Sequence, residues 1–206
     1  MEIIYKIKQS EKLKKIALWM LTPKNQARPR WWIKNFVNPF FRKKAKGARI
    51  QASVRVDILP FNPFKLGINS TIEDFCTVNN GMGKIDIGNY TRIGIGSVLI
   101  GPVTIGNNVR LAQNVVITAL NHNYTDVSKP ISEQGVNTQE VVIGDETWVG
   151  ANSVILPGVN VGKHCVIAAG SIVTKDIPSY SVVAGNPAKI KKQYDKLKSE
   201  WTKYEQ

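Results

Sequence analysis

Two histidines are the side chains of this sequence whose ordinary pKa lies near neutral pH. His122 lies in the stretch Leu120-Asn-His-Asn-Tyr, and His164 lies in Gly162-Lys-His-Cys. A neutral imidazole can accept the proton of an attacking hydroxyl or amine, and such general-base catalysis accelerates a reaction about 10²–10⁴-fold. His122 is the candidate base, because an interruption of the sequence pattern begins at this residue. We expect His164 to face solvent.

The cysteines and the small number of histidines restrict other chemistries. Cys76 and Cys165 lie among aliphatic residues, so we expect reduced core side chains rather than a disulfide framework or a nucleophile. No serine lies in the context of a nucleophile elbow. A catalytic zinc site of three histidines, such as the γ-type carbonic anhydrases use, cannot be built from two histidines. We therefore expect no metal requirement.

An aliphatic residue recurs every six positions through much of the chain. Period six fits neither a helix nor a plain alternating strand, but it fits a short strand followed by a tight corner. Three such units would close a triangular coil of about 18 residues, and several coils must stack to form a core. Glycine follows many of these anchors and would supply backbone freedom at the corners. The anchors are Ile87, Ile93, Leu99, Ile105, Leu111 and Ile117, then Ile143, Val149, Ile155, Val161, Ile167 and Val173.

Two interruptions of the repeat point to a functional edge. Residues 123–142 form a 20-residue insertion directly after His122, and a shorter one lies near Gly81-Met-Gly. A long loop inside a regular solenoid is usually functional or disordered. Stacking places both insertions at the same edge, two coils apart. Asn79, Asn80 and Met82 are therefore the candidate acceptor-binding residues, and Asp126 or Glu140 is a candidate to orient His122.

The two ends of the chain depart from the repeat. Residues 1–49 hold 14 Lys and Arg against two acidic residues, while the remaining 157 residues are nearly neutral. We expect this basic segment to be helical or irregular and the β-helical domain to span residues 50–187. From residue 188 to 206 a C-terminal helix is expected, because apolar residues recur at helical spacing: Ile190, Tyr194, Leu197, Trp201 and Tyr204.

Three stretches resemble the hexapeptide-repeat acetyltransferases, which include the galactoside, maltose and nodulation O-acetyltransferases. They are Ile143-Gly-Asp-Glu-Thr-Trp-Val-Gly-Ala-Asn-Ser-Val-Ile, residues 162–178, and Val183-Ala-Gly-Asn-Pro-Ala-Lys. The resemblance covers about residues 50–192 and implies a left-handed parallel β-helix, an all-β solenoid. Trp31-Trp32 and Asn38-Pro-Phe-Phe resemble more closely the members encoded with capsule and exopolysaccharide synthesis.

The resemblance also implies roles for single residues. His122 occupies the place of the family's catalytic histidine. The positions that contact the acetyl-CoA co-substrate in the family are matched by Trp148, Ala151, Ala169, Thr174, Lys175 and Lys192. The sugar acetyltransferases carry an acceptor-binding Asn one coil before the histidine, and the matching stretch, residues 94–96, has none. Their acceptor specificity therefore does not transfer directly.

The expected activity is acetyl transfer from acetyl-CoA to a hydroxyl of a sugar or polysaccharide precursor. In this hypothesis His122 deprotonates the acceptor, and the backbone N–H of Ala151 stabilises the oxyanion. Transfer is direct, without a covalent acetyl-enzyme. N-acetylation of an amino sugar and a non-enzymatic β-solenoid scaffold are the alternatives. Acyl carrier protein-dependent acyltransferases lack the Ala-Gly-Asn-Pro-Ala context, and a serine acetyltransferase would carry a larger N-terminal domain.

The expected partners follow from the family and from the charge. The family implies a homotrimer with active sites between subunits. The basic segment, with Trp19, Trp31 and Trp32, is interpreted either as a cap on the first coil or as a contact with an anionic membrane surface. Nucleic acid is not an expected partner, because no binding motif accompanies the charge. No apolar run is long enough to cross a membrane. We expect a cytoplasmic protein, with peripheral contact at the inner membrane face left open.

Overall fold

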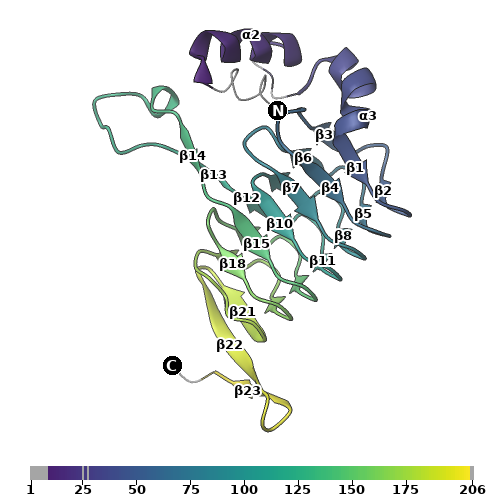
Figure 1. Cartoon of the computed structure of the whole chain (residues 1–206). Coiled ribbons are helices and arrows are strands. Elements are labelled where there is room, and N and C mark those ends of the chain that lie inside the picture. Colours follow the sequence, from purple (N-terminus) through teal and green to yellow (C-terminus); the bar gives the residue numbers. More distant parts are fainter. Residues whose placement is uncertain (1–8, 25, 27, 205–206) are drawn as a thin grey trace.

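The computed structural model describes residues 9–24, 26 and 28–204. Three parallel β-sheets wrap around one core as a left-handed β-helix of about six turns (Figure 1). We call the sheets A, B and C, in the order in which each turn of the chain passes through them. Each strand pairs in register with the strand one turn away. The predicted fold class is confirmed.

The strands of each sheet follow the six-residue period. Sheet A contains β1 (Arg42–Lys44), β4 (Phe64–Leu66), β7 (Ile85–Ile87), β10 (Val103–Ile105), β15 (Val141–Ile143) and β18 (Asn160–Val161). Sheet B contains β2 (Arg49–Ile50), β5 (Thr71–Ile72), β8 (Arg92–Ile93), β11 (Arg110–Leu111), β16 (Trp148–Val149), β19 (Val166–Ile167) and β21 (Ser181–Gly185). Sheet C contains β3 (Arg55–Asp57), β6 (Thr77–Asn79), β9 (Val98–Ile100), β12 (Val116–Thr118), β17 (Val154–Ile155) and β20 (Ile172–Val173).

The twelve predicted anchors form the core of the solenoid. Each is at most 3% exposed, and they belong to one continuous hydrophobic cluster. Burial of such side chains stabilises the fold by about 1.5–3 kcal/mol each. Cys76 and Cys165 are buried free thiols in the same cluster, as predicted, and burial raises the pKa of both. A protonated, buried thiol is a poor nucleophile.

Glycine occupies the position after many anchors for a different reason from the one we expected. Gly94 does not adopt a left-handed backbone conformation, but an added Cβ would overlap the Ala112 carbonyl of the next turn. Gly88 meets Gly106 in the same way. The left-handed corner positions are occupied instead by residues such as Asn114 and Asn152, a type that tolerates this conformation. Close stacking of turns, rather than backbone freedom, therefore selects glycine after the anchor.

The predicted C-terminal helix is wrong. Residues 188–203 form two antiparallel strands, β22 (Ala188–Asp195) and β23 (Glu200–Lys203), which continue sheet B from the edge of β21. An unpaired edge leaves backbone groups without partners, and this hairpin supplies them. Tyr194 lies opposite Trp201 across the hairpin, with ring centroids 5.5 Å apart. Leu197, expected on the apolar face of the helix, lies at the turn and is 97% exposed.

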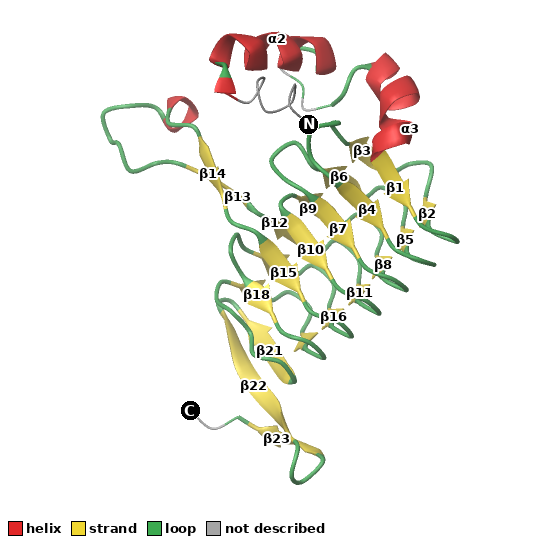
Figure 2. Ribbon diagram, in the orientation of Figure 1, coloured by secondary structure: helices red, strands yellow, loops and turns green. Residues whose placement is uncertain are grey.

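The helices in the described part lie mainly at the N-terminal end of the solenoid (Figure 2). They are α2 (Glu11–Leu21), a π-helix (Ile33–Val37) and α3 (Asn38–Phe41), and a short 3-10 helix (Ile131–Glu133) lies in the long loop. The N-terminal segment is shorter than predicted, because β1 already pairs with β4 from Arg42. None of the described helices is long and apolar enough to cross a membrane.

Candidate active site

His122 is the last residue of the first strand of a hairpin that leaves the solenoid between sheets C and A. The hairpin strands β13 (Leu120–His122) and β14 (Val136–Thr138) are antiparallel and project outward (Figure 1). The His122 side chain is exposed. The predicted long loop is therefore an ordered excursion that presents the histidine away from the hydrophobic core.

The loop beyond His122 is held together by its own hydrogen bonds. The Gln134 amide donates to the carbonyls of Asp126 at 2.8 Å and Lys129 at 3.0 Å, and its oxygen accepts from the Asp126 N–H. Asn123 donates to the Gln134 carbonyl at 3.0 Å and accepts from Asn137 at 2.7 Å. All of these contacts lie within the loop and its two strands.

Neither acidic residue considered for orienting His122 forms a hydrogen bond or an ion pair with its ring. Hydrogen bonds from Ser128, with an ion pair to Lys129 at 3.0 Å, hold the pKa of Asp126 below its usual value. Glu140 accepts from Thr104 at 2.6 Å and pairs with Lys84 at 3.0 Å, and these contacts lower its pKa. Within the described residues, the His122 ring therefore has no hydrogen-bonding partner on the same chain.

The acceptor-side candidates lie at the same corner as the hairpin, as predicted. A ladder of backbone hydrogen bonds runs along this corner: Gly101 donates to Asn79, Ala119 to Ile100, and Gln139 to Ala119. Asn79 is half-buried at the end of β6, and Met82 is exposed in the loop that follows. The corner therefore carries both insertions, two turns apart.

Asn80 does not have the predicted substrate-facing position. Its side chain is fully buried, and its amide donates to the carbonyls of Leu59 at 3.1 Å and Asn62 at 2.6 Å. Its oxygen accepts from the Leu59 N–H at 2.7 Å. Both of its amide hydrogens and its oxygen bond to the loop at residues 59–62, so Asn80 supports this corner and is withdrawn from the acceptor-side set.

The residues matched to acetyl-CoA contacts lie at three places on the solenoid. Trp148 lies on the outer face of sheet B and is exposed, and the register continues from it through Val166 and Val182 to Lys192. Ala151 and Ala169 stack at the corner between sheets B and C, where Gly170 donates to the Ala151 carbonyl at 2.8 Å. Thr174 and Lys175 follow β20 and lie at the other corner, between sheets C and A.

The backbone N–H of Ala151 is available to a ligand. In the described part of the chain it donates to no carbonyl or side chain, and the same holds for Ala169 one turn away. His122 and Ala151 lie beyond opposite ends of the sheet C strands. One chain alone therefore does not bring the predicted base and the predicted oxyanion donor together.

His164 faces solvent, as expected, and contacts other side chains on the surface. Its ring Nδ1 lies 3.2 Å from Glu146 Oε2, and the ring stacks on Trp201 with centroids 6.5 Å apart. Tyr180 lies on the same ring, with the His164 and Tyr180 centroids 5.8 Å apart. His164 therefore helps to attach the C-terminal hairpin.

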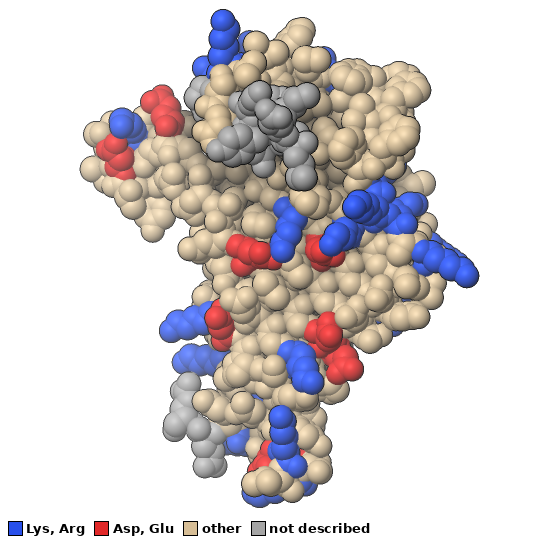
Figure 3. Space-filling model, viewed as in Figure 1, with Lys and Arg blue, Asp and Glu red and all other residues tan. Residues whose placement is uncertain are grey.

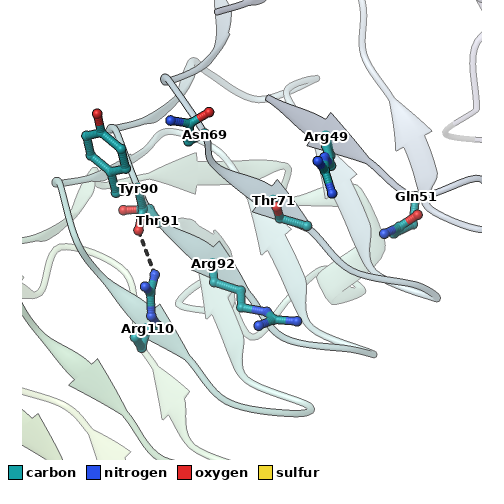
Figure 4. A pocket seen from close by; sticks show the side chains of 8 residues that line it. All are labelled: Arg49, Gln51, Asn69, Thr71, Tyr90, Thr91, Arg92 and Arg110. Carbon is teal, nitrogen blue, oxygen red and sulfur yellow. Dashed lines mark hydrogen bonds between the residues drawn. The ribbon is translucent and has the colours of Figure 1, made fainter. Parts of the chain in front are cut away.

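The structure also reveals a cavity and an ion pair that were not predicted. A cavity of about 330 Å³ on the outer face of sheet B is lined by Arg49, Arg92 and Arg110 together with Gln51, Asn69, Thr71, Tyr90 and Thr91 (Figure 4). Arg92 pairs with Glu73, and Arg110 donates to the Tyr90 carbonyl at 2.6 Å, so two of the three guanidinium groups are engaged. The sequence signal for this row is an Arg directly before Ile50 and before the anchors Ile93 and Leu111.

The unpredicted ion pair lies beside the acceptor corner. Arg55 Nη2 lies 2.7 Å from Asp57 Oδ2, and the Asp57 side chain is almost fully buried. Asp57 is in register with Asn79 on the neighbouring strand. An Arg-x-Asp pair on one strand face is a weak sequence signal, because alternation along a strand places any two such residues on the same face.

Comparison with known proteins places these features in one family. Residues 84–119 match the bacterial transferase hexapeptide (six repeats), and residues 140–175 match the hexapeptide repeat of succinyl-transferase. The dTDP-4-amino-4,6-dideoxy-D-glucose acyltransferase of Escherichia coli is 31% identical over 71% of this chain and 80% of its own length. The chain therefore belongs to the hexapeptide-repeat acetyltransferase family.

Other relatives are matched over a smaller share of their length. WbbJ of Escherichia coli K12, provisionally named a lipopolysaccharide biosynthesis O-acetyl transferase, is 35% identical over 58% of this chain and 63% of WbbJ. Two further relatives are matched over only 51% and 41% of their own length. A variant of AntD, an N-acyltransferase from Bacillus cereus solved with dTDP-4-amino-4,6-dideoxyglucose and coenzyme A, shares the fold, with a TM-score of 0.65 at 21% identity over 76% of this chain and 86% of AntD.

Proposed function

We propose that this protein transfers an acetyl group from acetyl-CoA to a hydroxyl of a sugar or polysaccharide precursor. The observation that carries the proposal is the exposed His122 on an ordered hairpin at the corner where the acceptor-side insertion also lies. Relatives named for both O-acetyl and N-acyl transfer support the reaction class, and the relative solved with a nucleotide sugar and coenzyme A supports a carbohydrate acceptor.

In the proposed reaction His122 takes the proton of the acceptor hydroxyl. The hydroxyl oxygen forms a bond to the acetyl carbon, the thioester C–S bond breaks, and the proton passes through His122 to the departing thiolate. The Ala151 N–H donates to the developing oxyanion, since it has no acceptor within the described chain. Trp148, Ala169 and Lys192 contact coenzyme A from sheet B and the adjoining corner. Thr174 and Lys175 do so from the other corner.

The proposal places each active site between two subunits of a homotrimer. His122 and Ala151 lie beyond opposite ends of sheet C in one chain, so a neighbouring copy would supply the second group. The hairpin that carries His122 projects away from its own solenoid, which suits a contact with a neighbour (Figure 1). The missing partner of the His122 ring is also expected from that neighbour.

A second candidate is N-acetylation of an amino sugar. It is favoured by the acyltransferase of 31% identity, whose name specifies a 4-amino sugar nucleotide. The same base would deprotonate the amine during attack.

Thiol release from acetyl-CoA tests the function. The purified protein is assayed with matched nucleotide sugars that carry either a hydroxyl or an amino group at the same ring position. Release that depends on the hydroxyl acceptor is expected. Release with the amino sugar only would establish the second candidate, and absence of both release and acetyl-CoA binding would contradict the proposal and favour a non-enzymatic solenoid.

A further inference from the structure

The N-terminal helices expose an unusual amount of apolar surface. Ten large apolar side chains in the described part of residues 9–41 are between 41% and 83% exposed: Leu13, Ile16, Leu18, Trp19, Met20, Trp31, Trp32, Phe36, Phe40 and Phe41. Large exposed apolar patches are uncommon on soluble proteins and often mark interaction sites, and these ten side chains all lie within one segment of about 30 residues. We call this set the N-terminal apolar surface.

The segment is anchored to the solenoid by few of its residues. Ile33 is buried, and Asn38 donates to the Ile58 carbonyl at 2.7 Å. If the segment served only to cap the first turn, its aromatic side chains would pack against that turn. They point outward instead, and Trp31 contacts Phe36 within the segment, with centroids 5.6 Å apart.

Positive charge surrounds the N-terminal apolar surface. Lys12, Lys15 and Lys34 are exposed on the same segment, and Lys43 and Lys46 are exposed in the first turn of the solenoid that follows it. Figure 3 shows Lys and Arg side chains on and just below the N-terminal helices, around a largely uncharged area. Residues 1–49 carry a net charge near +12, counted from 14 basic and two acidic residues. Two copies that met through this face would bring like charges together, so its charge favours an anionic partner.

α2 is too short to cross a bilayer and would lie along its surface. The 11 residues of α2 extend about 16 Å, roughly half of the hydrocarbon thickness of a bilayer. Helices that combine Lys or Arg with Trp, Phe and Leu lie in the interface, with the apolar groups in the acyl region and the cations at anionic headgroups.

We infer that the N-terminal apolar surface and its surrounding lysines dock this protein onto an anionic lipid bilayer. The hairpin that carries His122 slants toward the same end of the molecule (Figure 1), and the loop beyond it exposes Tyr124, Val127 and Ile131. Given the proposed function, this orientation suits an acceptor whose sugar is attached to a lipid. The docking itself does not depend on that function.

Vesicle co-sedimentation tests the docking with the full chain. The wild type is expected to bind phosphatidylcholine vesicles containing about one third phosphatidylglycerol at least about tenfold more strongly than pure phosphatidylcholine vesicles, and to be released by salt. The triple variant Trp19→Ser, Trp31→Ser and Phe40→Ser is expected to lose binding. The control Leu197→Ser, at the opposite end of the molecule, is expected to bind like the wild type.

A second pair of variants isolates the charge. Lys34→Gln, Lys43→Gln and Lys46→Gln together are expected to weaken binding to the anionic vesicles by about tenfold or more. The same change at Lys189, Lys198 and Lys203 on the C-terminal hairpin is expected to have little effect, because those exposed lysines lie at the far end. Unchanged circular dichroism and melting temperature establish that all variants fold.

Three results would overturn the inference. One is absence of binding by the wild type to the anionic vesicles. Another is an equal loss of binding in the C-terminal control variants. The third is a smaller assembly for the aromatic triple variant in sedimentation velocity, which would show that the face joins subunits. Acetyl transfer to a soluble acceptor is expected to be unaffected by the triple variant, so failure of docking and failure of the proposed function are distinguishable.

Discussion

His122 lies directly opposite Val136 across the antiparallel pair that forms the base of the long loop. The position of the imidazole therefore depends on the hairpin register, and the register depends on the hydrogen bonds that close the loop above it. Gln134 makes three of these bonds.

Removal of the Gln134 side chain is expected to loosen the loop without unfolding the solenoid. Gln134→Ala deletes three hydrogen bonds outside the core, so amide exchange in residues 123–135 should accelerate while the melting temperature changes little. The turnover number should fall at an unchanged KM for acetyl-CoA. Ser132→Ala, in the same loop, serves as the control. Unaltered exchange in the Gln134 variant would show that the loop is fixed by other contacts.

Asn80 is expected to be a stability residue. Asn80→Ala leaves the Leu59 N–H and two carbonyls without partners in a buried place, which should lower the free energy of unfolding by about 2–4 kcal/mol. Asn79→Ala removes one hydrogen bond, to the Gly81 N–H, and should cost about 1 kcal/mol or less. Chemical denaturation measures both. A destabilisation of Asn80→Ala no greater than that of Asn79→Ala would contradict this role.

The carboxylate of Glu140 is expected to stabilise the fold in a pH-dependent way. Hydrogen bonds from Thr104 and Lys84 lower its pKa, so its contribution is present above the ordinary value of 4.5 and is lost as the pH falls through the folded-state pKa. Glu140→Gln should therefore melt at a lower temperature than the wild type near pH 7. The two should converge at acidic pH, once the carboxyl group of Glu140 is protonated in the folded wild type.

A suitable control for this titration is Glu133→Gln, since Glu133 is exposed in the long loop. It should melt like the wild type at both pH values. A difference between wild type and Glu140→Gln that persists unchanged at low pH would show that the carboxylate charge is not the cause.

Mixing of two inactive variants is expected to restore activity if the active site lies between subunits. His122→Ala lacks the base, and Ala151→Pro lacks the N–H donor. Random reassembly pairs an intact His122 with an intact Ala151 at about one interface in four, so roughly a quarter of the wild-type rate should return. No recovery from verified mixed assemblies would place both groups in one chain.

The solenoid could be predicted because each strand and corner takes six residues, so the core residues recur at a fixed spacing in the sequence. Anchors such as Leu99 and Ile117 recur at one spacing, and each is buried against the turns above and below. Since every turn repeats the same strand and corner, the common edge of the two insertions also followed from counting residues.

The parts that failed depend on contacts that spacing does not encode. The spacing of Ile190, Tyr194 and Trp201 suits a helix, but the open edge of β21 favours a paired strand there. The direction of the Asn80 side chain depends on the loop at residues 59–62, which lies outside the repeat. The row of Arg49, Arg92 and Arg110 was visible in the sequence, but its meaning depends on the register of sheet B.

Replacement of His122 tests the central claim most directly. Steady-state thiol release from acetyl-CoA, with the acceptor that supports the highest rate, is compared for wild type, His122→Ala and His164→Ala. A general base predicts a turnover number about 10²–10⁴-fold lower for His122→Ala, with a KM for acetyl-CoA near that of the wild type. His164→Ala should retain its rate at temperatures where it remains folded. A wild-type rate in His122→Ala would contradict the assignment of His122 as the base.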